Sequence, residues 1–138
     1  IKQCLVGSEM CIRDRSPTVV SEVHEGATKK GDVRNSASLA AILAVKKTPL
    51  SLPHCHPIPI EGCNVEWQEV ENGLKCVVTV STTSKTGVEM EALCGVSTAL
   101  LCAWDMLKPI LKDSSGQYPD TKISDITVIS KLKIPTEN

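Results

Sequence analysis

Aromatic residues are almost absent from this chain, which has no phenylalanine and carries its few aromatic rings at Trp67, Trp104 and Tyr118. Proteins that bind single-stranded RNA stack bases on exposed aromatic rings. The scarcity of rings therefore argues against an RNA-binding domain, which we rank as the third hypothesis. A large excess of positive or negative charge is lacking as well, because the net charge is −1. The overall charge thus indicates neither a nucleic-acid partner nor a membrane partner.

Membrane and export signals are also missing. We find no apolar run that we judge long enough to span a bilayer. The first residues have an apolar start, but they lack the apolar core and the small-residue cleavage site of a signal peptide. We therefore expect a cytoplasmic protein.

The seven cysteines include no CxxC pair. Reduced thiols, several of them packed as small apolar side chains, are the simplest interpretation. A zinc site at His54, Cys55 and His56 is the alternative. It is disfavoured because neighbouring residues of an extended chain point to opposite sides and no paired CxxC follows. We expect no metal and no cofactor.

Residues 1–16 show no sustained hydrophobic period. We interpret them as a leader outside the domain, disordered or an artefact of translation or assembly. The remaining residues, 17–138, are enough to bury a core and are expected to form a single catalytic domain.

The next elements follow from hydrophobic spacing. Residues 17–25 fit either a short strand or a helical turn. Residues 26–33 are a polar loop whose Lys30 could be presented to an anion. A helix is predicted to begin at Asn35 or Ser36 and to run to about residue 47. Its apolar stripe is expected to contain Leu39, Ile42, Leu43 and Val45.

The second half of the chain predicts a hairpin, a long helix and a last strand. Asn72-Gly73 separates two alternating segments, residues 62–71 and 74–83. Residues 88–111 have helical spacing and residues 121–133 alternate again. The order indicates an α+β fold of the ferredoxin-like, split β-α-β kind, an antiparallel sheet with two helices on one face. The open face of such a sheet favours oligomerisation.

Ionisable residues gather at both ends of the predicted long helix. Glu89 and Glu91 flank Met90 at its start, and Asp105 and Lys108 lie three residues apart near its end. A solvated polar face is the usual meaning of such charges, but an Asp–Lys pair can also act as an acid–base unit. In a continuous helix Glu91 and Asp105 are ~21 Å apart along the axis. One small substrate then reaches both only in a pocket shared by two subunits.

Several motifs occur in a fixed order. They are Lys29-Lys30-Gly31-Asp32-Val33, Ala44-Val45-Lys46-Lys47-Thr48, Cys55-His56-Pro57, Lys85-Thr86-Gly87-Val88-Glu89-Met90-Glu91-Ala92-Leu93 and Asp105-Met106-Leu107-Lys108. This series resembles the MoaC family of molybdenum-cofactor biosynthesis, the cyclic pyranopterin monophosphate synthases, over about residues 18–133. The segment from Tyr118 to Ile123 is similar to that of archaeal members.

The resemblance implies a ferredoxin-like lyase that forms a hexamer, built as a trimer of dimers. Family members convert a cyclised GTP, 3′,8-cyclo-7,8-dihydro-GTP, into cyclic pyranopterin monophosphate and release pyrophosphate. Motif matching implies that the catalytic residues are Lys30, Asp105 and Lys108. It implies that the substrate-binding residues are Cys55, His56, Glu89, Met90 and Glu91.

Three departures from the family pattern keep a second hypothesis open. Residues 1–16 stand in place of a family segment that carries a site arginine. Residues 37–41 replace an Ala-Arg-Ile-Ala-Gly run, and a Gly-Gly-Lys-Ser-Gly tail is missing, although Lys131 lies near the place of its lysine. A chain altered in this way could bind without turnover. The alternative function is therefore a non-catalytic ferredoxin-like module that binds a small molecule such as a nucleotide.

Overall fold

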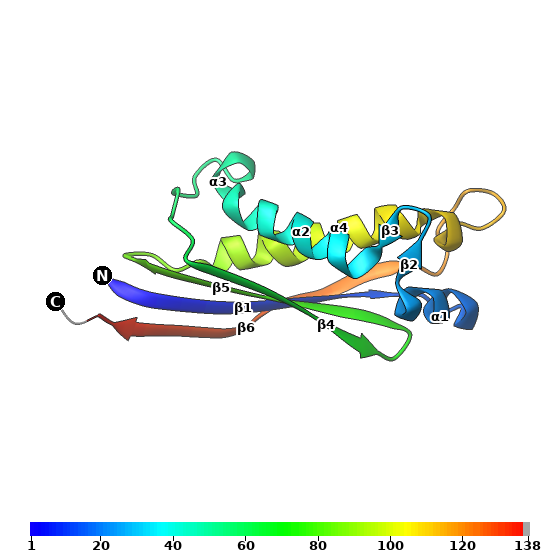
Figure 1. Cartoon of the computed structure of the whole chain (residues 1–138), viewed down its shortest axis with the longest axis horizontal. Coiled ribbons are helices and arrows are strands. Elements are labelled where there is room, and N and C mark those ends of the chain that lie inside the picture. The colour runs from blue at the N-terminus through cyan, green and yellow to red at the C-terminus, as the bar shows by residue number, and fades with distance from the viewer. Residues whose placement is uncertain (137–138) are drawn as a thin grey trace.

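The computed structural model describes residues 1–136 and has helices on one face of a four-stranded sheet (Figure 1). The sheet is antiparallel throughout, with the strand order β4-β5-β1-β6. Its strands are β1 (Lys2–Arg13), β4 (Gly62–Val70), β5 (Gly73–Ser84) and β6 (Lys122–Pro135). The helices are α1 (Pro17–Glu25), α2 (Val33–Lys46), α3 (Thr48–Ser51) and α4 (Glu89–Leu111). The α+β class, the antiparallel sheet and the two long helices over one face are confirmed.

The first residues are not disordered, so that part of the prediction for residues 1–16 is wrong. Residues 2–13 form β1, an inner strand that pairs with β5 from Lys2↔Ser84 to Arg13↔Gly73 and with β6 on its other side. Small and polar residues hide the alternation of buried and exposed side chains along β1. Ser8, for example, is fully buried, and its hydroxyl donates to the Ala92 carbonyl at 2.7 Å. Buried polar groups need such partners.

The segment 17–25, left open between strand and helix, is the helix α1. Pro17 occupies its first turn, where the missing N–H costs nothing. Gly26 ends it with φ of 72°, in the left-handed conformation that glycine adopts readily. The predicted polar loop after it contains a two-residue pair of strands, β2 (Ala27–Thr28) and β3 (Gly31–Asp32).

Helix α2 differs from the prediction in its cap and in its buried face. Asp32 is the N-cap, because its carboxylate accepts from the Asn35 backbone N–H at 2.9 Å. Leu39 and Leu43, expected in the core, are 58% and 46% exposed. The buried face consists instead of Val33, Ala37, Ala41 and Val45. These smaller side chains let α2 approach α4 closely.

Gly95 marks a close approach between α4 and its neighbours. A Cβ atom added there would lie 2.7 Å from Val45 Cγ2 and 3.1 Å from Val78 Cγ1. We expect Gly95→Ala to lower the free energy of unfolding by about 1 kcal/mol, because overpacking outweighs the gain in helix propensity. Urea unfolding of the parent and of Gly95→Ala measures this difference. Ser97→Ala, a change on a less buried side of α4, is the control. A Gly95→Ala protein more stable than the parent would contradict it.

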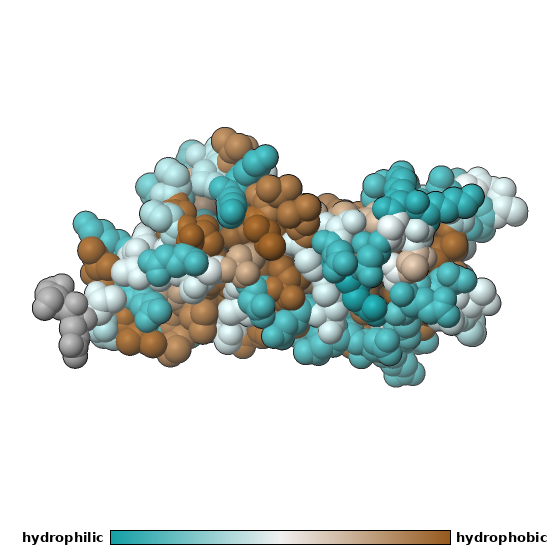
Figure 2. All heavy atoms as spheres, viewed as in Figure 1, coloured by the Kyte–Doolittle hydropathy of each residue, from teal (hydrophilic) through white to brown (hydrophobic). Residues whose placement is uncertain are grey.

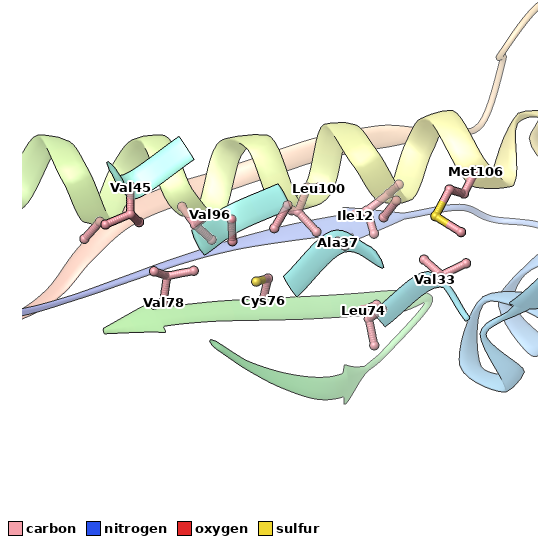
Figure 3. Packing of buried hydrophobic residues seen from close by; sticks show 14 of the residues in the cluster. Ile12, Val33, Ala37, Val45, Leu74, Cys76, Val78, Val96, Leu100 and Met106 are labelled. Carbon is pink, nitrogen blue, oxygen red and sulfur yellow. The ribbon is translucent and has the colours of Figure 1, made fainter. Parts of the chain in front are cut away.

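Helix α4 is long and apolar enough, by length and composition, to cross a membrane, which corrects the expectation that no run reaches this length. Its apolar residues form the centre of the core, however. Val96 and Leu100 point toward Val78 and Cys76 of β5, and Val45 of α2 lies alongside (Figure 3). The helix thus packs as the core helix of an α+β domain.

Apolar side chains remain exposed on both layers. In the helical layer they include Leu39 and Leu43 of α2, Leu50 of α3 and Leu101 of α4. Figure 2 shows apolar surface gathered over α2. On the opposite face of the sheet Leu5 pairs with Leu132, and their exposed fractions are 39% and 50%. Within residues 1–136 no helix covers that face of the sheet. Contiguous apolar surface of this kind marks contact sites.

Candidate functional site

Three of the predicted site residues meet near the C-terminal end of α4. Lys108 Nζ lies 2.9 Å from Asp105 Oδ1, and Lys30 Nζ lies 3.9 Å from Asp105 Oδ2. The side chains are between 42% and 62% exposed, so they are open to a ligand. We call Lys30, Asp105 and Lys108 the Lys108 cluster. Residues from two distant motifs are thereby brought into one site.

A tight turn presents Lys30 to this cluster. Thr28 Oγ1 donates to the Gly31 carbonyl and accepts from the Lys30 backbone N–H, both at 3.1 Å. Gly31 has φ of 111°, which a side chain would strain, and this explains the glycine after the lysine.

In the Lys108 cluster, Asp105 and Lys108 each stabilise the charged form of the other. The hydrogen bond from Lys108 holds the pKa of Asp105 below its ordinary value, and the same bond raises the pKa of Lys108. Burial among cations would lower the pKa of a lysine, but Lys108 is 42% exposed and Asp105 dominates its surroundings. At neutral pH the pair is a carboxylate and an ammonium.

Two surface hollows flank the cluster. One, of about 540 Å³, is lined by Leu101, Trp104, Asp105, Lys108 and Ile123. The other, of about 330 Å³, has Thr28, Lys29, Lys30, Met106, Pro109 and Ile110 among its walls. Both volumes are in the range of small-molecule sites, and both combine apolar walls with a few charged groups.

The remaining predicted residues lie at the opposite end of α4. Cys55 Sγ donates to Glu91 Oε2 at 3.6 Å, which ties the Cys-His-Pro segment to the helix. Glu91 is only 2% exposed, so it does not belong to a solvated face. His56 and Met90 are exposed. We call Cys55, His56, Glu89, Met90 and Glu91 the Glu89 cluster.

The thiol of Cys55 is held neutral in this cluster. Its burial raises its pKa, and the nearby Glu91 carboxylate raises it further. Cys55 thus serves as a hydrogen-bond donor to Glu91 rather than as a nucleophile, since only the thiolate attacks.

Lys131 of β6 forms an ion pair with Glu89 that sequence reasoning did not place. Partial burial alone would raise the pKa of Glu89. The hydrogen bond from Lys131, a backbone hydrogen bond at Glu89 and the charges of Lys131 and Lys133 outweigh the burial and lower that pKa. The sequence had indicated Lys131 only through its place near the lysine of the missing Gly-Gly-Lys-Ser-Gly tail. The pairing of β6 with β1 brings it to α4, which no local pattern reports.

This ion pair predicts a pH-dependent stability. Glu89 has a lowered folded-state pKa, so the pair stabilises the fold above the ordinary value of 4.5 and this stabilisation is lost as the pH falls through the lowered pKa. We expect Lys131→Met to cost about 1 kcal/mol at pH 7 and far less at pH 3, allowing for the exposure of Lys131. Urea unfolding at both pH values measures it, with Lys133→Met as the weaker control. Equal losses at both pH values would contradict it.

The two clusters are separate within one chain. Helix α4 runs unbroken from Glu89 to Leu111, so Glu91 and Asp105 are ~21 Å apart along its axis. The structure therefore brings the catalytic candidates together and the substrate-binding candidates together, but not the two sets. Across residues 1–136 no three His, Cys, Asp or Glu side chains converge as a metal site would require, at His54 or elsewhere.

Known proteins are similar in sequence to this chain over most of its length. A sequence model described as the MoaC family matches residues 8–133, beginning within β1. A protein of Methanospirillum hungatei is 50% identical over 117 residues, 85% of this chain and 75% of its own. A protein of Aeropyrum pernix is 52% identical over 114 residues, covering 83% and 78%. One of Thermococcus kodakarensis is 49% identical over 117 residues, covering 85% and 75%. All three are named probable cyclic pyranopterin monophosphate synthase.

Proposed function

This chain belongs to the MoaC family, and we propose that it is a cyclic pyranopterin monophosphate synthase, a lyase of molybdenum cofactor biosynthesis. It converts 3′,8-cyclo-7,8-dihydro-GTP into cyclic pyranopterin monophosphate and pyrophosphate. The observation that carries the proposal is the contact of Lys30, Asp105 and Lys108, residues from separate motifs that form one cluster. All seven cysteines are free, which agrees with a cytoplasmic location.

We assign the fold to the ferredoxin-like, split β-α-β class. The strand order β4-β5-β1-β6 supports this assignment. In it, α2 connects β1 to β4 and α4 connects β5 to β6, while α1 and α3 are additions. The single catalytic domain assigned to residues 17–138 is completed by β1 at the centre of its sheet.

The reaction requires cations and proton transfers. A hydroxyl oxygen bonds to the α-phosphorus, the bond from that phosphorus to the pyrophosphate oxygen breaks, and the hydroxyl proton passes to water. Lys30 and Lys108 supply positive charge for the phosphates through charge-assisted hydrogen bonds, and His56 donates a further hydrogen bond. Lys108, an ammonium beside Asp105, donates a proton to the departing pyrophosphate oxygen, and Asp105 holds Lys108 in place.

The site is shared between subunits in this proposal. The ~21 Å between Glu91 and Asp105 exceeds the reach of one small substrate. A second copy that presents its Glu89 cluster to the Lys108 cluster of the first removes this difficulty. The two exposed apolar surfaces, one on the helical layer and one on the open sheet face, support two kinds of contact. Two different interfaces are what a dihedral hexamer, a trimer of dimers, needs.

Turnover of the cyclised GTP tests the function. We expect equal amounts of cyclic pyranopterin monophosphate and pyrophosphate from the parent protein, detected by mass spectrometry and by a phosphate-release assay. Binding of the cyclised GTP without either product would favour the non-catalytic binding module. Binding of single-stranded RNA in place of the nucleotide would favour the third hypothesis.

A further inference from the structure

The segment between α4 and β6 is held in a fixed turn. The Asp113 carboxylate accepts from the backbone N–H groups of Ser115 and Gln117, both at 2.9 Å, and from Ser115 Oγ at 2.7 Å. Gly116 closes the turn with φ of 80° and donates to the Asp113 carbonyl at 3.0 Å. A side chain that turns back on its own backbone in this way fixes the loop locally.

The far end of the same segment is fixed to the sheet. Thr121 Oγ1 donates to Asp14 Oδ2 at 2.7 Å, and Asp14 is only 5% exposed. Tyr118 lies between these two anchors, so its backbone position is determined from both sides.

The ring of Tyr118 rests on Trp104. The ring centroids are 5.2 Å apart and the planes are tilted by 56°, within the range of favourable aromatic pairs. Trp104 lies one helical turn before Lys108, so the two side chains share a side of α4 and line the same hollow. Tyr118 is therefore beside Lys108, and it adds to the rise in the pKa of Lys108 that Asp105 dominates.

We infer that Tyr118 is a positioning residue for Lys108: its ring, fixed on Trp104 by the Asp113 turn, confines the Lys108 ammonium to Asp105 and to the mouth of the hollow. A lysine has a long flexible stem, and without a neighbour its ammonium samples many positions. Small displacements of a reacting group lower the rate of catalysis strongly. That Lys108 takes part in turnover rests on the proposed function; that Tyr118 confines Lys108 does not.

Amine labelling tests the confinement without any turnover. Limiting acetic anhydride acetylates lysines according to their access and free-amine fraction, and peptide mass spectrometry reports Lys108 relative to the exposed Lys112 of the same chain. We expect this ratio to rise about threefold or more in Tyr118→Ala and in Trp104→Leu, because the ammonium is released. We expect Tyr118→Phe, which keeps the ring, to resemble the parent. An unchanged ratio in both ring-removing variants would overturn the inference.

Turnover then separates this inference from the proposed function. We expect Tyr118→Ala to lower kcat about 10-fold with little change in KM, and Tyr118→Phe and Ser114→Ala, a loop control, to keep the parent kcat. A parent without turnover but with the labelling change would refute the proposed function and support the positioning role. Lost turnover with an unchanged labelling ratio would overturn the positioning role.

Discussion

Lys108→Ala is expected to lower kcat for conversion of the cyclised GTP by about 10³-fold, within the range that a positioned proton donor contributes. The same change removes one of the cations that hold the triphosphate, so KM is expected to rise as well. Stability should hardly change, because the Lys108 side chain is 42% exposed and its ion pair with Asp105 lies at the surface. Steady-state kinetics with thermal unfolding as a control measures both.

The matched control is Lys112→Ala, which removes an exposed lysine one turn further along the chain. We expect it to retain the parent rate. Its only hydrogen bond to Lys108 within residues 1–136 runs from the Lys112 backbone N–H to the Lys108 carbonyl, which alanine keeps. Normal turnover by Lys108→Ala would show that Lys108 is neither the proton donor nor a needed cation. The site would then have to be sought in the Glu89 cluster alone.

A mixture of two inactive variants is expected to regain activity. Lys108→Ala damages one cluster and His56→Ala damages the other, and His56 is exposed, so neither change should disturb folding. When subunits mix at random, half of the dimers contain one of each, and one of their two shared sites is intact. About a quarter of the parent activity should therefore return.

The comparison uses unfolding and joint refolding of the two variants, so that their subunits mix at random. Each variant refolded alone is the control and should stay inactive. Activity of the mixture no greater than the mean of the two alone would mean that each site lies within one subunit. In that case the separation along α4 would leave the Glu89 cluster without a part in the reaction.

Local patterns predicted the second half of the fold well. The Asn72-Gly73 turn and the alternation on both sides of it correspond to β4 and β5, and the helical spacing from residue 88 corresponds to α4. These elements are long and strongly periodic, so the pattern leaves little choice of structure.

The first half shows what a local pattern leaves out. The strand β1 contains Gly7 and Ser8, and the buried Ser8 hydroxyl finds its hydrogen-bond partner only across the fold, at the Ala92 carbonyl. Helix α2 offers an alanine face and a leucine face, and periodicity does not say which face packs. Because α4 approaches closely at Gly95, only the face of α2 with small side chains fits against it. Leu39 and Leu43 therefore remain exposed.

The candidate site was predicted residue by residue from motifs, and the structure divides those residues into two clusters. Their separation follows from sequence, because helix length is fixed by residue number. The ion pair of Lys131 with Glu89 and the place of Tyr118 beside Trp104 were not predicted, because they depend on the pairing of β6 and on the turn at Asp113. Side chains brought in by tertiary contacts leave no local signal.

The structure of the assembled protein with the cyclised GTP or its product bound, determined by crystallography or cryo-electron microscopy, is the most direct test of the shared site. We predict that one ligand contacts Lys108 and Lys30 of one subunit together with His56 and Glu91 of another. A ligand held by a single subunit, or a protein that is a monomer with ligand bound, would contradict the shared site.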